Sequence, residues 1–443
     1  METLLRGVVW FSFYVFLILV PLVVAAIFRG EAGGRTFLIG LGVACGYVGL
    51  SIMVFQFALI SRVKSVSGAF GQDVLERFHR EMGYVAAGFL IAHPMLLILG
   101  GYPLGILNPL WEGNLAVWRW GALALYSALP LIVLATFRKI LHVPYEWWQW
   151  SHAGLATLAV CCGVAHMFLL RNYSASVVMR VLWAVYTLVF VGLALWYRIL
   201  RPLLQWRRPW TLIANKAEAG GAHTLVLHPQ GHDGMVFEPG QFAWLSMGRT
   251  PFHFEQHPIS ISSSAEVPKG GDVTFTVKAL GDWSAKVVPA IQPGTSFWVD
   301  GPYGVFSPDW DQGPGYVLIA GGIGITPLRS MCETLADRGD VRPVILFYGG
   351  RDWEGLTFRE ELDALASRMN LKIVYVLEKP CECWQGERGF ITPDLLRRHL
   401  PAQYRRYQYF VCGPPALMNA MERMLPGIGV PHEQVHTERF DLV

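Results

Sequence analysis

The sequence contains two fifteen-residue stretches that begin and end with histidine, HREMGYVAAGFLIAH over residues 79–93 and HAGLATLAVCCGVAH over residues 152–166. Fourteen residues are just under four helical turns, so the two histidines of each stretch share one helix face, about 21 Å apart along the axis. Ionisable residues inside an apolar helix are costly and usually functional. These four histidines therefore decide how the first half of the chain is interpreted.

Charge is distributed unevenly along the chain. Of 443 residues, 53% are apolar and 16% are charged, whereas a soluble domain averages about 25% charged residues. Residues 1–200 hold only 20 of the 69 Asp, Glu, Lys and Arg residues. This pattern excludes a disordered chain, a disulfide scaffold and a single water-soluble globule.

Six stretches in the first half are apolar and long enough to cross a hydrocarbon core about 30 Å thick. They cover residues 8–28, 36–60, 82–101, 117–137, 152–170 and 177–200. The first is too long for the apolar part of a signal peptide, and no small-residue cleavage site follows it. Placing the N-terminus inside assigns eleven Lys and Arg residues to the inner segments and five to the outer ones. The sequence therefore predicts a multi-pass protein of the cell membrane with both termini in the cytoplasm.

The histidine stretches lie in the third and fifth spans, which run in the same direction. We expect His79 to face His152 near the inner surface, and His93 to face His166 near the outer surface. This arrangement suits two stacked haems, each held by two imidazoles. A zinc ion is excluded, because its ligands must converge within about 2.1 Å of one ion. A single histidine at a helix end, such as His142, is more often an interfacial polar group.

Net charge and cysteine content exclude other classes. The net charge of +3, without a long Lys or Arg run, gives no reason to expect nucleic acid. The seven cysteines have no zinc-site spacing, and their odd number argues against a disulfide framework. Cys381–Glu–Cys383 is interpreted as plain loop sequence.

The second half has two successive patterns. From about residue 209, short alternating strands with Gly and Pro turns predict a small antiparallel barrel, with strands at 224–228, 241–246, 273–279 and 296–300. From about residue 315, strands alternate with helices, which is typical of a parallel α/β sheet. Its strands are expected at 316–320, 344–348, 372–377 and 407–412, and its helices at 325–335, 358–369, 392–399 and 415–425.

A glycine-rich turn, GGIGITP over 321–327, follows the first strand of that sheet. Gly321, Gly322 and Gly324 allow backbone N–H groups to approach a phosphate at a helix N-terminus. Ligands of such sheets bind at the carboxyl ends of the strands. Alone, this turn is equally consistent with a tight turn that binds nothing.

Five short motifs in the second half, taken together, resemble those of a known protein family. In order they are HPIS at 257–260, GDWS at 281–284, GPYG at 301–304, GGIGITP at 321–327 and CGPP at 412–415. With the histidine pairs, they make the chain resemble the NADPH oxidase and ferric reductase superfamily over almost its whole length. The resemblance implies a six-helix all-α transmembrane haem domain over 1–204, an antiparallel β-barrel FAD domain over 205–312, and an α/β NADPH-binding domain over 313–443. The last two are similar to ferredoxin–NADP reductase.

The resemblance also implies roles for particular residues. FAD would be bound by His257, Pro258, Ile259, Ser260, Lys278, Trp283 and Ser284. The nucleotide pyrophosphate would lie along Gly322, Gly324, Ile325, Thr326 and Pro327, and the nicotinamide beside Cys412, Gly413 and Pro414. Phe440 matches the aromatic residue that shields the flavin, although Asp441–Val443 follow it here. Cys412 and Phe440 are the expected catalytic residues.

Arg351 follows the second strand of the predicted α/β sheet. An arginine at such a position can pair with a 2′-phosphate, which favours NADPH over NADH. The alternatives are that Arg351 is a solvated loop residue, or that neighbouring Asp352 accepts a ribose hydroxyl.

The resemblance implies an oxidoreductase that carries electrons from cytoplasmic NADPH through FAD and two b-type haems to an outer acceptor. Dioxygen, giving superoxide, is the expected acceptor, and a ferric or cupric reductase is the alternative. Leu97 stands where some oxidases of the family carry a second histidine. A non-enzymatic haem protein would not need the flavin and nucleotide motifs, and a flavoreductase without haem would leave four histidines unexplained. No regulatory segment is evident, so no obligatory cytosolic activator is expected.

Overall fold

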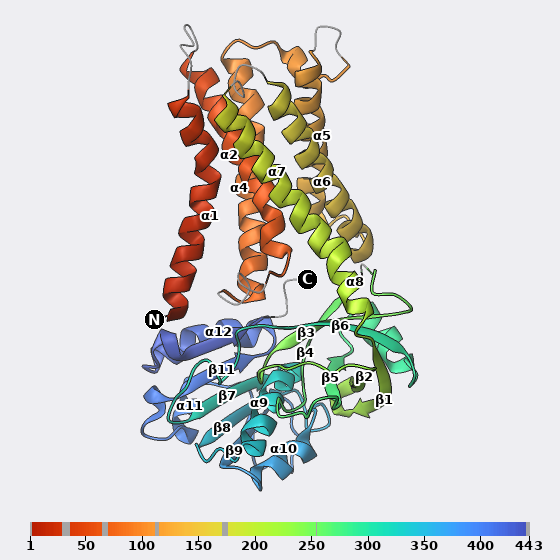
Figure 1. Cartoon of the computed structure of the whole chain (residues 1–443). Coiled ribbons are helices and arrows are strands. Elements are labelled where there is room, and N and C mark those ends of the chain that lie inside the picture. Colours follow the sequence, from red (N-terminus) through yellow and green to blue (C-terminus); the bar gives the residue numbers. More distant parts are fainter. Residues whose placement is uncertain are drawn as a thin grey trace. The chain divides into compact units, whose positions relative to one another are not determined.

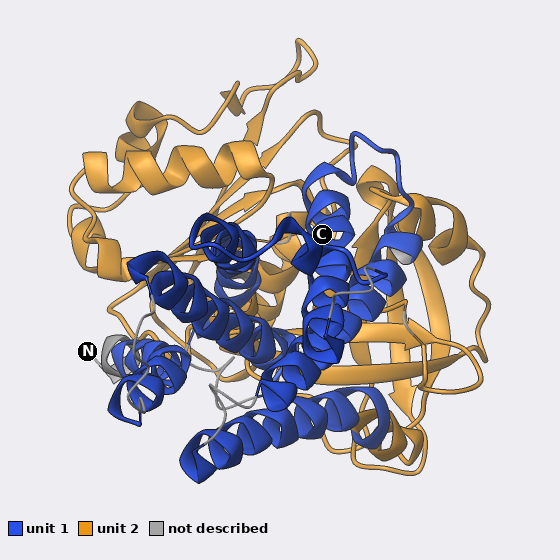
Figure 2. Cartoon of the chain, turned by 90° about the horizontal axis from the view of Figure 1, so that it is seen from above, with its two compact units in different colours: residues 1–70, 74–200 blue, residues 71–73, 201–443 orange. Residues whose placement is uncertain are grey.

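The computed structural model describes residues 2–28, 36–63, 70–110, 115–170, 176–253 and 255–439. The chain divides into two compact units, which Figure 2 shows in different colours. The first, the membrane unit, comprises residues 1–70 and 74–200. The second, the reductase unit, comprises residues 71–73 and 201–443. The finer division into three domains, at 204 and 312, stays a prediction.

The membrane unit is built of long helices (Figure 1). They are α1 (Glu2–Ile27), α2 (Phe37–Ile60), α4 (Gln72–Leu99), α5 (Ala116–Phe137), α6 (Tyr145–Leu169) and α7 (Val177–Leu195), with a π-helical turn over Trp196–Leu200. Six described helices are long and apolar enough to cross a membrane, which confirms the predicted number of spans. Large apolar side chains such as Leu99 and Leu188 are about 70% exposed, as suits a surface that contacts lipid.

Three helices begin several residues before the predicted spans. α1 begins at Glu2, six residues before 8, α4 begins at Gln72, ten residues before 82, and α6 begins at Tyr145, seven residues before 152. Hydropathy marks only the part of a helix inside the hydrocarbon core, whereas the backbone hydrogen bonds continue into the polar interface. His79 and His152 consequently lie within their helices and not at the ends.

The first sheet of the reductase unit is antiparallel and has the strand order β4-β3-β6-β1-β2-β5. Its strands are β1 (Trp210–Glu218), β2 (Ala222–Pro229), β3 (Phe242–Met247), β4 (His257–Ser260), β5 (Val273–Lys278) and β6 (Ser296–Tyr303). A bridge between Ile261 and Phe275 joins the two edges, because β4 and β5 are the outermost strands. The predicted antiparallel barrel is therefore confirmed, and β1 and β4 lie in the region where the sequence predicts strands, although it gives bounds for neither.

The second sheet is parallel and has the order β10-β9-β8-β7-β11-β12. Its strands are β7 (Tyr316–Gly321), β8 (Val344–Gly350), β9 (Leu371–Leu377), β10 (Glu387–Arg388), β11 (Gln408–Cys412) and β12 (Val435–Glu438). One apolar cluster packs α9 (Ile325–Asp337) and α10 (Arg359–Ala366) on one face, and another packs α11 (Pro393–His399) and α12 (Pro415–Gly427) on the other. The predicted α/β sheet is confirmed, and β7 is buried throughout, as a central parallel strand should be.

The loop after β9 contains a disulfide between Cys381 and Cys383, whose Cα atoms are 5.3 Å apart. The interpretation of this segment as plain loop sequence is wrong. The odd number of cysteines argues against a framework of several bridges but does not exclude one local bridge, in which a single intervening residue lets the two side chains meet.

Candidate functional sites

The four histidines of the membrane unit lie in two facing pairs between α4 and α6. The ring centres of His79 and His152 are 6.2 Å apart, and those of His93 and His166 are 6.3 Å apart. The planes within each pair are inclined by 60° and 71°. The structure therefore brings together the same partners that the spacing predicts.

These distances fit a metal ion held between two imidazoles. A metal–imidazole bond is about 2.0–2.1 Å and the bonded nitrogen lies about 1.1 Å from its ring centre, so two imidazoles on opposite sides of one ion have centres about 6.2 Å apart. Among the described residues, no group of three or more His, Cys, Asp or Glu side chains is placed to hold a metal. The donor set is thus suited to a metal that brings its other ligands, as haem iron does.

Backbone carbonyls orient the pair His93 and His166, which we call the outer pair after its predicted position in the membrane, with His79 and His152 as the inner pair. His93 Nδ1 lies 2.8 Å from the Gly42 carbonyl oxygen on α2, and His166 Nδ1 lies 2.6 Å from the Val117 carbonyl oxygen on α5. Since a carbonyl can only accept, each Nδ1 must carry the proton, which leaves the Nε2 lone pair available to a metal. The rings reach the backbone because Gly46 and Gly121 carry no side chain: an added Cβ would lie 2.8 Å and 3.0 Å from the respective imidazole.

A cavity of about 1280 Å³, which includes space open to solvent, surrounds the outer pair. Its lining includes His93, His166 and many apolar side chains, and none of the lining residues is Lys, Arg, Asp or Glu. Leu97, Tyr102 and Trp118 belong to this lining, next to the connection between α4 and α5. The residues that line this space are therefore suited to an apolar group with histidine on two sides.

In the reductase unit, the glycine-rich turn and the CGPP motif meet at the carboxyl ends of β7 and β11. These neighbouring strands are the point where the strand order reverses, which is where ligands of open α/β sheets bind. A Cβ added to Gly324 would lie 2.2 Å from the Cys412 carbonyl oxygen, and one on Gly321 would lie 2.8 Å from Pro414. Glycine is required here for close backbone approach at the start of α9, where N–H groups can receive a phosphate.

The residues expected to bind FAD converge on the same region of this unit. The His257 ring on β4 stacks on Trp283 with centres 3.7 Å apart and planes 16° apart. Ser284 Oγ accepts a hydrogen bond from the Gly281 N–H (2.8 Å) and closes the turn. Lys278 Nζ, at the end of β5, lies 4.0 Å from the position that a Cβ of Gly322 would occupy. The lysine expected to bind FAD and the turn expected to bind the nucleotide are thus neighbours.

The protonation states of two site residues follow from burial. Burial lowers the pKa of His257 to about 4, so its imidazole is neutral at physiological pH. Burial, with a contribution from Glu438, raises the pKa of the Cys412 thiol well above its usual value. Cys412 is therefore a thiol and not a thiolate at physiological pH.

Arg351 and Asp352 occupy different environments after β8. Asp352 Oδ1 accepts a hydrogen bond from the Gly355 N–H (2.9 Å), so this carboxylate stabilises its own loop. Arg351 is exposed, and its backbone is fixed by the Lys379 N–H, which donates to its carbonyl (2.7 Å). The structure thus favours Arg351 over Asp352 as the side chain available to a ligand at this strand end.

Strand β12 lies beside β11, next to the candidate nucleotide site at Cys412. Glu438 pairs with Cys412, and Thr437 pairs with Val411, in the parallel register of β11 and β12. Phe440, the expected shield of the flavin, lies outside the described residues.

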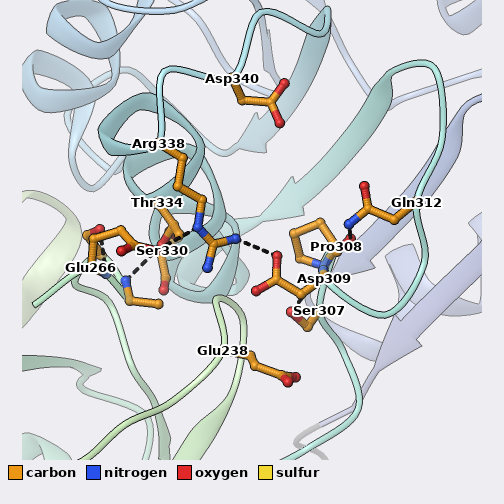
Figure 3. Close-up of polar contacts among 12 residues, drawn as sticks. Glu238, Glu266, Ser307, Pro308, Asp309, Gln312, Ser330, Thr334, Arg338 and Asp340 are labelled. Carbon is orange, nitrogen blue, oxygen red and sulfur yellow. Dashed lines mark hydrogen bonds and ion pairs between the residues drawn. The ribbon is translucent and has the colours of Figure 1, made fainter.

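A polar face of α9, which sequence analysis missed, fastens the two sheets of the reductase unit together (Figure 3). Ser330 Oγ donates to the Ser263 carbonyl (2.7 Å), and Thr334 Oγ1 accepts from the Ala265 N–H (2.8 Å). Arg338 bonds Glu266 (2.6 Å) and Asp309 (2.5 Å). We call these three helix residues the α9 clamp.

The α9 clamp links the two parts of the candidate site. The loop it holds continues from β4, which carries the HPIS motif, and α9 itself begins at the glycine-rich turn. The signal in the sequence is a polar side chain every fourth residue, at 330, 334 and the C-cap position 338, which places all three on one face. The clamp therefore sets the distance between the expected flavin strand and the expected nucleotide turn.

Known proteins resemble both units. Residues 45–164 match the family described as "Ferric reductase like transmembrane component", and residues 318–423 match "Oxidoreductase NAD-binding domain". NADH-cytochrome b5 reductase 2 of Scheffersomyces stipitis is 33% identical over 161 residues, 35% of this chain and 54% of that protein. Ferredoxin–NADP reductase B of Sorangium cellulosum is 27% identical over 217 residues, 46% of this chain and 86% of that protein.

The FAD/NAD-binding domain of a nitric oxide dioxygenase from Vibrio cholerae superposes with a TM-score of 0.46 at 21% identity, over 53% of this chain and 98% of that one. This chain spans about half the length of the cytochrome b5 reductase that it matches.

A membrane unit of six apolar helices, joined in one chain to a flavin- and nucleotide-binding reductase unit, defines a multi-pass membrane oxidoreductase. Within that class, the two family matches fit the architecture of the NADPH oxidase and ferric reductase superfamily, which the motifs predict. Its reductase relatives support binding of FAD and NAD(P)H, and the architecture indicates transmembrane electron transfer.

Proposed function

We propose that the protein oxidises cytoplasmic NADPH, passes the electrons singly through FAD and two bis-histidine b-type haems, and reduces dioxygen to superoxide on the outer face of the cell membrane. Each NADPH would give one NADP⁺, one proton and two superoxide ions from two dioxygen molecules. The observation that carries the proposal is the pair of imidazole–imidazole distances, 6.2 and 6.3 Å, each of which fits one iron.

The order of cofactors follows from their chemistry. Nicotinamide releases a hydride, which is two electrons at once, and haem iron accepts one electron at a time when it is bound. A flavin does both, so it belongs between them. The motif residues supply the binding surfaces: His257–Ser260, Lys278, Trp283 and Ser284 for FAD, Gly322, Gly324–Pro327 and Arg351 for NADPH, and Cys412–Pro414 with Phe440 at the nicotinamide.

The four histidines would hold the haems, His79 with His152 on the inner side and His93 with His166 on the outer side. The carbonyls of Gly42 and Val117 fix the tautomer of the outer pair. Gly46 and Gly121 give these rings room against α2 and α5. With His93 and His166 both bound to its metal, the outer haem would pass an electron to the acceptor at the edge of the site and not by binding the acceptor.

Dioxygen fits the outer cavity better than a metal chelate. Dioxygen is small and apolar, whereas ferric citrate is an anion that needs basic groups to bind. The described lining contains no Lys or Arg, and its outer part is formed by side chains such as Leu97, Tyr102 and Trp118. Ferric or cupric reduction on the same scaffold is the competing outcome of the assay below.

Difference spectra test the haem part of the proposal. The purified full chain should show reduced-minus-oxidised bands of low-spin bis-imidazole haem, with two haems per chain by pyridine haemochrome. His93→Ala and His152→Ala should each lose one of them. Gly154→Ala is a matched control on α6, since an added Cβ there meets no atom within 4 Å. Absence of haem in the wild-type protein would overturn the proposal.

An acceptor assay tests the proposed reduction of dioxygen to superoxide. NADPH-driven reduction of cytochrome c should be abolished by superoxide dismutase, and ferric citrate should not compete. Turnover that is insensitive to superoxide dismutase and saturates with ferric citrate would assign the metalloreductase instead. Turnover by the purified chain alone is expected, since no cytosolic activator is proposed.

A further inference from the structure

The two histidine pairs differ in what their Nδ1 atoms contact. In the outer pair, both Nδ1 atoms donate to backbone carbonyls, at 2.8 and 2.6 Å. In the inner pair, Nδ1 of His79 and Nδ1 of His152 are buried, and neither has a hydrogen-bond partner within the described part of the chain. The pairs are alike in ring separation and differ in this second contact.

The sequence of the flanking helices shows why the contact is not repeated. α2 and α5 run from the outer to the inner side, so residues fourteen positions after Gly46 and Gly121 lie at the inner level. Those residues are Ile60 and Ala135. In addition, Gln56 Nε2 donates to the His79 backbone carbonyl (3.0 Å), so this nearby polar group on α2 contacts the backbone and not the imidazole.

A cation lies near the inner pair. The Trp148 ring lies 5.2 Å from the His152 ring, and the Arg138 guanidinium lies 5.2 Å from the Trp148 ring. A positive charge at this position stabilises the reduced state of a nearby metal centre and so raises its midpoint potential. Both differences, the missing Nδ1 contact and the nearby cation, favour a higher midpoint potential at the inner pair.

We infer that the outer ligand pair is the more basic, and that the outer haem has the lower midpoint potential. The inference rests on the proposed function, because it concerns the haems assigned there. An imidazole that donates Nδ1–H to a carbonyl is a stronger donor to metal and stabilises the oxidised ion. Reduction at either site adds one electron and breaks no bond to histidine. The outer site is then the stronger reductant, as suits the one-electron reduction of dioxygen.

Potentiometric titration of the purified full chain, followed at the haem α-band, tests this inference. We expect two one-electron components whose equilibrium constants differ at least tenfold, which is 59 mV for a one-electron couple. His93→Ala should remove the low-potential component, and His152→Ala the high-potential one. FAD content serves as the check that each variant is folded.

Milder variants test the two causes separately. Gly46→Ala presses a methyl group against His93 and should raise the midpoint potential of the low-potential haem. Gly88→Ala on α4 is the control, because no atom lies within 4 Å of the added Cβ, and it should leave that potential unchanged. Arg138→Gln should lower the higher potential more than Lys139→Gln, which removes the same charge from the neighbouring exposed residue.

The outcomes separate the inference from the proposed function. If two haems are present but His93→Ala removes the high-potential component, or the two potentials coincide, the inference is wrong and the proposed function stands. If His93→Ala retains both haems, the ligand assignment itself is wrong. If Gly46→Ala and Gly88→Ala give the same titration, the carbonyl contact does not set the potential.

Discussion

The membrane unit and the reductase unit position their sites by opposite means. In the membrane unit, side chains form the site, and the backbone, through the Gly42 and Val117 carbonyls, orients them. In the reductase unit, the backbone forms the site at the glycine-rich turn, and side chains of the α9 clamp orient it. The difference teaches that the sequence encodes the candidate site of the membrane unit in the spacing of a few residues. It encodes the candidate site of the reductase unit in short contiguous motifs.

The largest expected effect is the loss of one histidine ligand. His152→Ala should lower NADPH-driven superoxide formation about 100-fold or more, because removing even an outer-shell partner of a metal costs about 10–100-fold. NADPH oxidation with a soluble dye as acceptor should stay near the wild-type rate, since the reductase unit is unchanged. Equal loss of both activities would show that the two units do not act separately.

Substitution in the glycine-rich turn should affect the reductase unit alone. Gly324→Ala places a methyl group 2.2 Å from the Cys412 carbonyl, and such overpacking costs about 1–3 kcal/mol. We expect lower kcat/KM for NADPH in the dye assay with unchanged haem content. Gly427→Ala, at the end of α12 with no atom within 4 Å, is the control.

Arg351→Ala should reduce the preference for NADPH over NADH about tenfold, since a charge-assisted contact to a phosphate contributes about 1.5–3 kcal/mol. The measurement is the ratio of kcat/KM for the two nucleotides. Arg397→Ala removes an exposed arginine from α11 and should leave the ratio unchanged. An unchanged ratio in Arg351→Ala would show that a different residue selects the nucleotide.

Breaking the α9 clamp should have a smaller effect. Thr334→Val leaves the Ala265 N–H without its acceptor, at a cost of about 1–3 kcal/mol. A positioning role predicts a lower rate of flavin reduction by NADPH in stopped-flow measurements, with KM little changed. A lower melting temperature alone, with a normal flavin-reduction rate, would assign the clamp a purely structural role.

The smallest expected effect is on pH dependence. Burial holds the pKa of His257 near 4, below the usual value of 6.5. Between these values the unfolded chain binds a proton that the folded protein excludes, so stability is complete above pH 6.5 and falls as the pH falls toward 4. Lowering the pH from 7 to 5 should cost about 1–2 kcal/mol. His257→Asn should flatten this slope in thermal unfolding of the FAD-free protein, and an unaltered slope would assign it to other groups.

Sequence analysis predicts the features that local patterns encode. Fourteen-residue spacing identifies the histidine partners, and apolar runs identify the six spans. The ends of α4 and α6 are not predicted, because helices continue past the apolar core into segments that contain Arg77 and Tyr145. β1 is missed because its sequence, WTLIANKAE, mixes polar and apolar residues without strict alternation. The α9 clamp and the carbonyl contacts of His93 and His166 join residues 29 to 72 positions apart, which no local pattern reveals.

The two histidine stretches have equal length, so the two histidines of α4 lie as far apart along the helix axis as the two histidines of α6. One residue inserted between His79 and His93 would rotate one imidazole about 100° relative to the other and shift it about 1.5 Å along the axis. The same insertion made between His152 and His166 would restore the axial match, but it would turn that imidazole in the same rotational sense, so the two rings would point away from each other. Single-residue insertions and deletions in these stretches should thus not be tolerated even when both helices carry them, which offers alignment-based and engineering approaches a way to recognise this architecture from the lengths of the two stretches.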